Sequence, residues 1–397
     1  MPWSETTAMD QKVLFALDVA CGRFSLSELC ERFGISRKTG HKWAQRFREE
    51  GVAGLMDRSH ATRTSPHRTP LGVEQALLGM RARHPRWGAR KIAVKVAQRH
   101  PELDLPHVST IHEILRRNGL VREQPKRRSI GHPGRPTGAV VSPNDCWSAD
   151  FKGQFRLGNG SVCYPLTVTD NYSRYLLGCQ GLPGTQLEAT KAVFTKLFKE
   201  FGLPRRIRTD NGVPFAAPTL GRLSQLSVWW LKLGIHPELI EPGKPQQNGR
   251  HERMHRTLKE ATAQPPQRTM RSQQQCMDQF RVEYNQERPH EALAMAVPKD
   301  WYQASPRPMP TRVESPVYPD RFEVRYVSAN GGIRWKNRWV NLTSVLVGEH
   351  VGLEEVEDGL WEVYFGTHRL GRLHERHMRI EDHLCRLKRK VSPISPD

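Results

Sequence analysis

Three acidic residues in the 397-residue chain occupy positions where side chains could do chemistry. Asp150 falls on the polar side of an expected strand, facing away from Trp147 and Phe151. Asp210 follows the run 206–208 at the carboxyl end of another expected strand, where open α/β sheets bind ligands. Glu252 follows a Pro/Gly-rich loop and opens an expected helix over 251–263. Each acid therefore lies at the edge of a regular element.

Converging carboxylates suit a metal site because they repel one another unless a cation joins them. Hard oxygen ligands favour Mg²⁺ or Mn²⁺, and a pair of such ions can activate the attacking oxygen and stabilise the leaving oxygen of a phosphodiester displacement. We predict that Asp150, Asp210 and Glu252 are catalytic and bind two Mg²⁺ or Mn²⁺ ions. Glu252, Arg256 and Lys259 share one helix face, so the two cations are expected to hold DNA phosphates.

The three acids lie in a part of the chain whose expected secondary structure is a mixture of strands and helices. Residues 144–300 predict an α/β core with a mixed sheet and helices packed against it. Its expected strands are 147–151, 162–168, 172–177 and 206–208, with Asn159-Gly160 as a hairpin turn and a helix over 186–201.

The front of the chain predicts two helical units, 1–60 and 61–121. The spacing from Cys30 to Trp43 is that of a helix-turn-helix, although Gly40 is expected to weaken its second helix. A plain helical pair for protein contacts is the alternative. The expected DNA contacts are Arg37, Lys38, His41 and Lys42 in the first unit and Arg116 and Arg117 in the second.

Two further segments flank the core. Residues 122–143 read as a basic linker that offers Arg127, Arg128 and Arg135 to DNA. After 300, short runs at 322–327, 333–340, 345–347, 351–356 and 361–365 predict strands of a small β-barrel over 301–375. The tail 376–397 is expected to be basic, with a solvated helix or arm over 376–390.

Composition narrows the class of protein. The chain has 61 Lys and Arg against 41 Asp and Glu, so a formal net charge of +20 makes a polyanion the expected partner. No apolar run approaches the roughly 18 residues of a membrane span, and the start lacks a secretory core. The seven cysteines are scattered, which indicates reduced thiols in a cytoplasmic protein without a membrane partner.

Three motifs together resemble bacterial insertion-sequence transposases with a retroviral-integrase-like core. They are Trp147-Ser-Ala-Asp150-Phe, Thr209-Asp210-Asn211-Gly212, and Pro242-Gly-Lys-Pro-Gln-Gln-Asn-Gly249 leading into Glu252-Arg-Met-His-Arg-Thr-Leu-Lys259. Tyr284-Asn285 with Arg288-Pro289-His290 matches the segment that commonly closes that core.

The resemblance implies an RNase H-like fold whose acid triad is Asp150, Asp210 and Glu252. It also implies cutting at the ends of a mobile element and joining of the exposed 3′ hydroxyl to target DNA. Such enzymes work as homo-oligomers, at least dimers on paired double-stranded ends, in the bacterial nucleoid. Gln247 and Asn248 are then expected to contact DNA from the loop before Glu252.

Some features depart from that pattern or admit another interpretation. Forty-one residues separate Asp210 from Glu252, against roughly 35 in the wider family, and we expect the extra length to enlarge a loop at 216–227. Asp170 could replace a triad member but is expected to shape a turn. The chain could instead be a catalytically inactive DNA-binding regulator. The segment 251–255 also spells the H-E-x-x-H pattern of zinc peptidases, although its neighbours are cationic.

Overall fold

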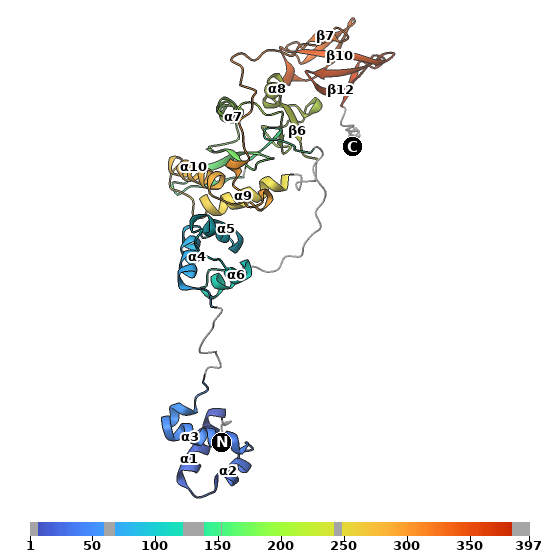
Figure 1. Cartoon of the computed structure of the whole chain (residues 1–397). Coiled ribbons are helices and arrows are strands. Elements are labelled where there is room, and N and C mark those ends of the chain that lie inside the picture. The colour runs from blue at the N-terminus through green and yellow to red at the C-terminus, as the bar shows by residue number, and fades with distance from the viewer. Residues whose placement is uncertain (1–6, 59–67, 122–138, 152, 242–247, 383–397) are drawn as a thin grey trace, which may run out of the picture. The chain divides into compact units, whose positions relative to one another are not determined.

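The computed structural model describes residues 7–58, 68–121, 139–151, 153–241 and 248–382 (Figure 1). The chain divides into two compact units, Met1–Pro70 and Leu71–Asp397. Within the described ranges, no helix combines the length and apolar character needed to cross a membrane.

The first unit contains the three predicted helices, α1 (Ala8–Cys21), α2 (Leu26–Arg32) and α3 (Arg37–Glu50), followed by the 3₁₀ turn η1 (Gly51–Leu55). Ser25 and Ser36 begin α2 and α3 by accepting hydrogen bonds from backbone N–H groups of the first turn. Gly40 is buried in α3, and a Cβ there would lie 2.3 Å from the Cys30 Sγ of α2. The glycine therefore permits close packing of α3 on α2, at the expense of helix propensity.

The second unit begins with three helices, α4 (Leu71–Arg83), α5 (Ala89–Arg99) and α6 (Val108–Arg117). They enclose their own hydrophobic cluster, in which Leu77, Ile92 and Ile111 are fully buried. The predicted helical segment over 71–121 is therefore present, with its apolar stripes turned inward.

The core of the second unit is the predicted mixed sheet. Its strands are β1 (Cys146–Phe151), β2 (Phe155–Arg156), β3 (Val162–Asp170), β4 (Leu176–Leu182), β5 (Arg206–Thr209) and β6 (His236–Leu239). They lie in the order β2-β3-β1-β5-β6, with β4 also paired to β3. β1 is antiparallel to β3 and parallel to β5. The strand expected at 172–177 begins only at Leu176, because the chain turns between Asp170 and Tyr175.

Helices cover both faces of this sheet (Figure 1). On one face, α7 (Leu187–Phe201) and α8 (Gln225–Lys232) pack onto a cluster that includes Trp147 and Ala149 of β1. On the other face, α9 (Gly249–Thr262) and α10 (Met270–Gln286) pack onto Cys163 and Cys179. Successive side chains of a strand point to opposite faces. Asp150 therefore points toward the face covered by α9.

The C-terminal region is all-β. An antiparallel sheet runs in the order β13 (Arg379–Asp382), β12 (His368–His374), β11 (Leu360–Phe365), β10 (His350–Glu357) and β7 (Glu323–Tyr326). A hairpin of β8 (Gly332–Trp335) and β9 (Arg338–Asn341) forms a separate two-stranded sheet. Within residues 248–382 the paired strands do not close into a barrel.

Three expectations for this region are wrong. Residues 333–340 are not one strand, because the chain reverses at Lys336, whose φ is +49°. Residues 345 and 346 belong to the 3₁₀ turn η6 (Ser344–Leu346), which Thr343 begins by accepting from the Val345 N–H and which ends before Val347. The segment 379–382, expected in a helix or arm, is strand β13, because it completes the edge of the sheet beside β12. Residues 383–397 of the predicted tail lie outside the described part.

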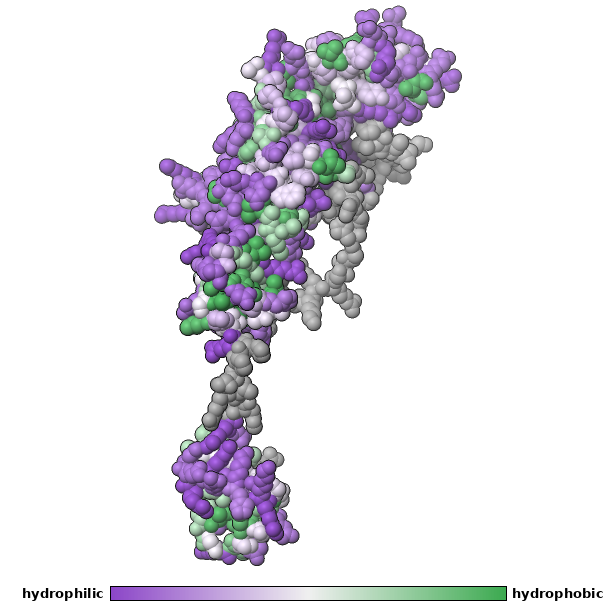
Figure 2. All heavy atoms as spheres, viewed as in Figure 1, coloured by the Kyte–Doolittle hydropathy of each residue, from purple (hydrophilic) through white to green (hydrophobic). Residues whose placement is uncertain are grey.

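The C-terminal sheet and the core share a hydrophobic cluster. Val228 and Leu231 of α8 pack with Leu346 and Leu370, and Lys232 pairs with Glu349 at 2.6 Å. Hydrophilic residues dominate the face of the C-terminal sheet that Figure 2 draws. The apolar side chains of this region therefore form its interior, which residues of the core extend.

Candidate active site

The parallel pairing of β1 with β5 positions the first two predicted acids. The register joins Cys146 to Arg206 and Ser148 to Arg208. Continued by two residues, it sets Asp150 beside Asp210 on neighbouring strands, which are about 4.8 Å apart in a sheet. Both side chains are half-buried. The pairing is therefore expected to bring near one another two carboxylates that lie 60 residues apart in the sequence.

The turn after β5 holds Asp210 and its neighbour. The Gly212 N–H donates to Asp210 Oδ1 at 3.1 Å. Asn211 Nδ2 donates to the Ile240 carbonyl at 2.9 Å, and Arg222 Nη1 donates to Asn211 Oδ1 at 2.8 Å. Asn211 therefore connects the ends of β5 and β6.

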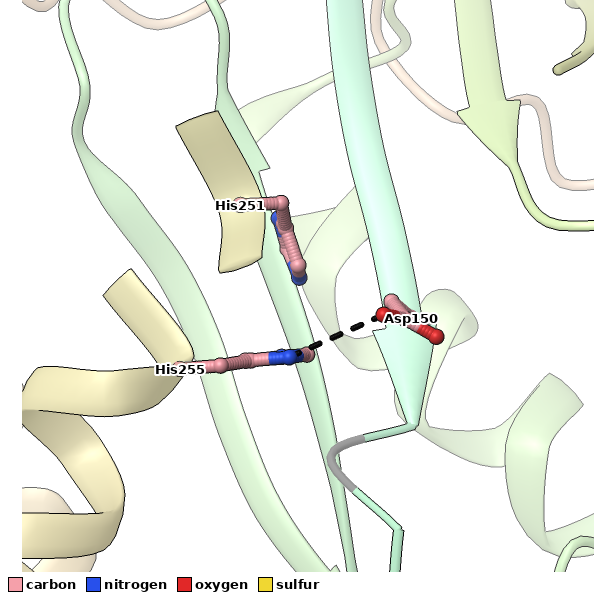
Figure 3. A group of neighbouring side chains, drawn as sticks. All are labelled: Asp150, His251 and His255. Carbon is pink, nitrogen blue, oxygen red and sulfur yellow. Dashed lines mark ion pairs between the residues drawn. The ribbon is translucent and has the colours of Figure 1, made fainter. Parts of the chain in front are cut away.

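Asp150 faces two histidines from the buried side of α9 (Figure 3). His255 Nδ1 lies 3.6 Å from Asp150 Oδ2, an ion-pair separation that is too long for a hydrogen bond. The rings of His251 and His255 are edge-to-face, with their centroids 4.5 Å apart. Both histidines are almost completely buried, at 2% and 3% exposed. The i, i+4 spacing explains why both side chains reach the sheet.

Two threonines of β3 bind these imidazoles. Thr167 Oγ1 lies 2.7 Å from His251 Nε2 and 2.6 Å from His255 Nε2. Thr169 Oγ1 lies 2.9 Å from His251 Nδ1. Thr167 is also the β3 residue directly opposite Asp150, and its hydroxyl donates to the Asp150 carbonyl at 3.2 Å. Burial lowers the pKa of His251 to about 3, so this imidazole is neutral at physiological pH.

Glu252 lies on the exposed side of the same helix, in its first turn. Arg256 and Lys259 are exposed as well, as their predicted common face requires. Glu252 precedes His255 by three residues, so the two side chains are neighbours on the helix surface. The catalytic role of all three acids stays a prediction, because Asp210 and Glu252 are not part of the described group that Asp150 forms with the histidines.

Asp170 has the structural role predicted for it. It is fully buried and accepts hydrogen bonds from the Asn144 N–H at 2.8 Å, the Ser173 N–H at 2.8 Å and the Ser173 hydroxyl at 2.6 Å. Burial raises the pKa of Asp170 even though these donors favour the charged form. Asp170 thus shapes the turn from β3 into β4.

The donor sets available here differ in chemistry. Asp150 and Asp210 provide the hard oxygen ligands that suit Mg²⁺ or Mn²⁺, and they fit the predicted metal site. Asp150, His251 and His255 offer ligand atoms within 4.8 Å of one another, a set that resembles a zinc site. Both nitrogens of His251, however, lie within hydrogen-bonding distance of threonine hydroxyls. This arrangement disfavours the zinc-peptidase interpretation of the H-E-x-x-H pattern.

The predicted DNA contacts have different surroundings. In α3, the four residues Arg37, Lys38, His41 and Lys42 are all exposed. In α6, Arg116 pairs with Glu113 at 2.6 Å and Arg117 pairs with Glu74.

The remaining predicted contacts lie before or around the core. Asn248 is 6% exposed and precedes α9, a buried position that disfavours a contact with DNA. Arg127, Arg128, Arg135 and Gln247 fall outside the described residues.

The sequence analysis missed the role of His251 and His255 beside Asp150. Their spacing was visible as H-E-x-x-H, and the polar side of 162–170 carries Thr167 and Thr169. Period-2 and period-3.6 patterns identify the inward faces of a strand and a helix, but they do not say which strand a helix covers. The histidine spacing could be read from the sequence, but the strand that the histidines contact could not.

Matches to known domain families cover most of this architecture. Residues 141–245 and 233–298 match two families described as integrase core domain. Residues 11–63 match a helix-turn-helix domain, and residues 39–115 match a homeodomain-like domain. Residues 322–380 match the C-terminal domain of IS481 family transposases. In these segments the chain is similar to integrase cores and to the C-terminal domain of insertion-sequence transposases.

Individual relatives agree with this class. The chain is 27% identical over 277 residues to an uncharacterized 39.2 kDa protein of insertion element IS476 from Xanthomonas euvesicatoria, which covers 68% of this chain and 75% of that protein. It is 28% identical over 196 residues to a 31.7 kDa protein of insertion element IS407 from Burkholderia multivorans, covering 48% of this chain and 67% of that protein. These matches confirm the resemblance to insertion-sequence transposases with a retroviral-integrase-like core.

A solved structure is also similar over much of the chain. The simian T-cell lymphotropic virus intasome, in complex with PP2A regulatory subunit B56 gamma, covers 74% of this chain and 97% of the matched one. The identity is 15% and the TM-score is 0.36.

Proposed function

We propose that this chain is a DNA transposase that binds the ends of its mobile element, cleaves DNA and transfers the 3′-hydroxyl end to target DNA. The observation that carries the proposal is the parallel pairing of β1 with β5 up to Ser148 and Arg208, since each predicted acid follows its paired residue by two positions. Glu252 supports it from α9, one helical turn before the histidine that faces Asp150.

Asp150, Asp210 and Glu252 would hold two Mg²⁺ or Mn²⁺ ions. When bound, such ions activate the attacking oxygen and stabilise the leaving oxygen of an in-line phosphodiester displacement. The protein's own part is to fix the carboxylates: strand pairing holds Asp150, and the Gly212 N–H holds Asp210. Arg256 and Lys259 follow Glu252 on its exposed face, where they would hold DNA phosphates.

The rest of the chain would bind and pair DNA ends. The units 1–60 and 61–121 would recognise the terminal repeats, and the linker 122–143 would add phosphate contacts. The region 301–375 would act as a separate β module after the catalytic core 144–300. We further propose that the protein works as a homo-oligomer, at least a dimer on paired ends, on nucleoid DNA of a bacterial host.

The deciding experiment uses the DNA that flanks the reading frame as the candidate element end. Purified protein is incubated with this DNA and Mg²⁺ or Mn²⁺, and the products are examined for a free 3′ hydroxyl and for joining to a target plasmid. We expect Asp210→Asn and Glu252→Gln to abolish both steps, because an amide keeps the shape but lacks the charge that holds a cation. Glu260→Gln is the matched control, since Glu260 is an exposed acid on the same helix.

The same material tests the alternative, an inactive DNA-binding regulator. Tight end binding without cutting, across several metals and end lengths, would establish the regulator in place of the transposase. Binding itself should depend steeply on salt. With six to ten phosphate contacts, the affinity should fall by about three to five decades between 50 and 200 mM salt.

A further inference from the structure

A cavity lies where the helical segment α4 to α6 meets the core. Its walls are residues 88–91 at the start of α5, residues 107–109 and His112 at the start of α6, and Glu291 of the 3₁₀ turn η4 (Glu291–Leu293). Its volume is about 630 Å³, and most of the wall residues are exposed. The same two parts of the chain also meet at His84, just after α4, whose Nδ1 lies 3.1 Å from Glu283 Oε1 of α10. The cavity can therefore admit a ligand from solvent within one compact unit.

The charged groups in the walls are mainly positive. Arg90 is exposed and Lys91 is half-buried, while Glu291 is the one acid among the described walls. Neither cationic side chain forms an ion pair or a hydrogen bond with another residue in the described part of the chain. Their N–H groups can therefore donate to a ligand in the cavity.

Lys91 lies among further positive charges of the core. Burial lowers the pKa of Lys91 to about 8, and the charges of Arg288 and Arg253 act in the same direction. Glu291 acts in the opposite direction. Burial, Lys91 and Arg288 also lower the pKa of His290 to about 3. Positive charge thus exceeds negative charge on this side of the cavity, and a bound anion would offset the excess.

The chemistry of the walls fits a phosphate of a nucleic acid. Guanidinium and ammonium groups are the usual partners of phosphate oxygens. The described walls contain no Phe, Tyr or Trp on which a base could stack, so the backbone is the part of a nucleic acid that fits here. The location agrees, because Arg253 directly follows the predicted catalytic acid Glu252, and α6 belongs to a unit expected to bind DNA.

We propose that Arg90 and Lys91 bind one backbone phosphate of the element-end DNA in this cavity, with Arg253 and Arg288 adding positive charge from the core. The proposal rests on the proposed function for the identity of the DNA. It names a contact at which the segment α4 to α6 and the core hold the same DNA. The contact would keep the element end beside α9, which carries a predicted catalytic acid.

The first test is binding of the fluorescently labelled end duplex to the full-length protein, measured by anisotropy in EDTA over a series of salt concentrations. Lys91→Met keeps much of the apolar stem of the side chain but removes the charge. We expect it to weaken binding about eightfold at about 100 mM salt and to reduce the slope of log affinity against log salt by about 0.9, the value for one phosphate contact. Arg90→Gln should act in the same direction. The end and an unrelated duplex should be affected equally, since phosphates carry no sequence information.

A scan of the end duplex with single neutral methylphosphonates identifies the phosphate. One of these should weaken binding of the original protein and have little further effect on Lys91→Met, because the same contact is then removed from both sides. Lys95→Met is the matched control. Lys95 is a half-buried lysine one turn further along α5, but it lies outside the described walls and has acidic neighbours in Glu287 and Asp300. This control should keep the salt slope and the response to the methylphosphonate.

The outcomes separate this inference from the proposed function. An unchanged salt slope in both Lys91→Met and Arg90→Gln would overturn the inference, and so would additive effects of Lys91→Met and every methylphosphonate. Inorganic phosphate at constant ionic strength distinguishes the source of the anion. If it stabilises the original protein but not Lys91→Met, while the salt slopes for DNA are equal, the cavity binds free phosphate only and the inference is wrong. If end cleavage persists with equal slopes, only this inference fails. If the original protein neither binds nor cleaves the end, the proposed function fails as well.

Discussion

Thr167→Val is the substitution that most directly probes the polar contacts under the candidate active site. Valine has nearly the shape of threonine but no hydroxyl, and the Thr167 hydroxyl lies 2.7 and 2.6 Å from two buried imidazole nitrogens. Each hydrogen bond lost at a buried imidazole nitrogen costs about 1–3 kcal/mol, so Thr167→Val should lower the unfolding free energy by about 2–6 kcal/mol.

The assay is urea unfolding of the full-length chain in EDTA at pH 8, with the midpoint and slope of the core transition compared between variants. Thr195→Val is the control, because the Thr195 hydroxyl on α7 is exposed and donates only to the Lys191 carbonyl among the contacts described, at 2.8 Å. We expect the control to change stability by no more than about 0.5 kcal/mol. A loss below about 1 kcal/mol for Thr167→Val would refute the conclusion that the Thr167 hydroxyl hydrogen-bonds to both buried imidazoles.

Three further predictions concern packing and the roles of neighbouring residues. Gly40→Ala should destabilise the first unit by about 1–3 kcal/mol in thermal unfolding, because the new Cβ would clash with Cys30. Adding Cys30→Ala to this variant should restore stability, and a Gly40→Ala protein that is more stable than the original would contradict this packing. Asp170→Asn should lower the unfolding free energy by about 1–3 kcal/mol and leave the affinity for Mn²⁺ unchanged, whereas Asp150→Asn should weaken Mn²⁺ binding. If both variants weaken Mn²⁺ binding equally in a titration, Asp170 is not purely structural. Leu346→Ala should lower the unfolding free energy by about 2–5 kcal/mol and shift the urea transition of the core, because Leu346 is fully buried in a cluster shared with α8. A shift confined to a separate transition of the C-terminal region would contradict that coupling.

Much of the core could be predicted because its signals are local. Alternation in 147–151 predicts a strand with Asp150 on the face opposite Trp147, and the structure has that strand and that orientation. The helix-turn-helix was visible from the spacing between Cys30 and Trp43. Local patterns of this kind report which residues turn inward, since burial imposes the period of the element on the sequence.

The errors arise where the decisive contact is remote in sequence. Residues 379–382 form a strand only because β12 offers an edge to pair with, and no pattern within four residues specifies that. The run 333–340 carries the β-formers Ile333, Trp335, Trp339 and Val340, and the turn between them at Lys336 and Asn337 has no glycine to mark it. The histidines of α9 were visible as a pair, but the strand beneath them was not. In each of these cases the structure depends on which other segment of the chain the residues contact.

The segment 216–227, expected to be an enlarged loop, is partly regular structure. The segment contains the 3₁₀ turn η2 (Leu220–Arg222) and the start of α8. Leu223 from this segment joins the cluster shared with the C-terminal sheet, while Arg222 donates to Asn211, the residue after Asp210. The segment 216–227 thus contacts both the C-terminal sheet and the turn that holds a predicted catalytic acid. Its residues are fixed by these two contacts, and this is why the sequence pattern for a loop was misleading here.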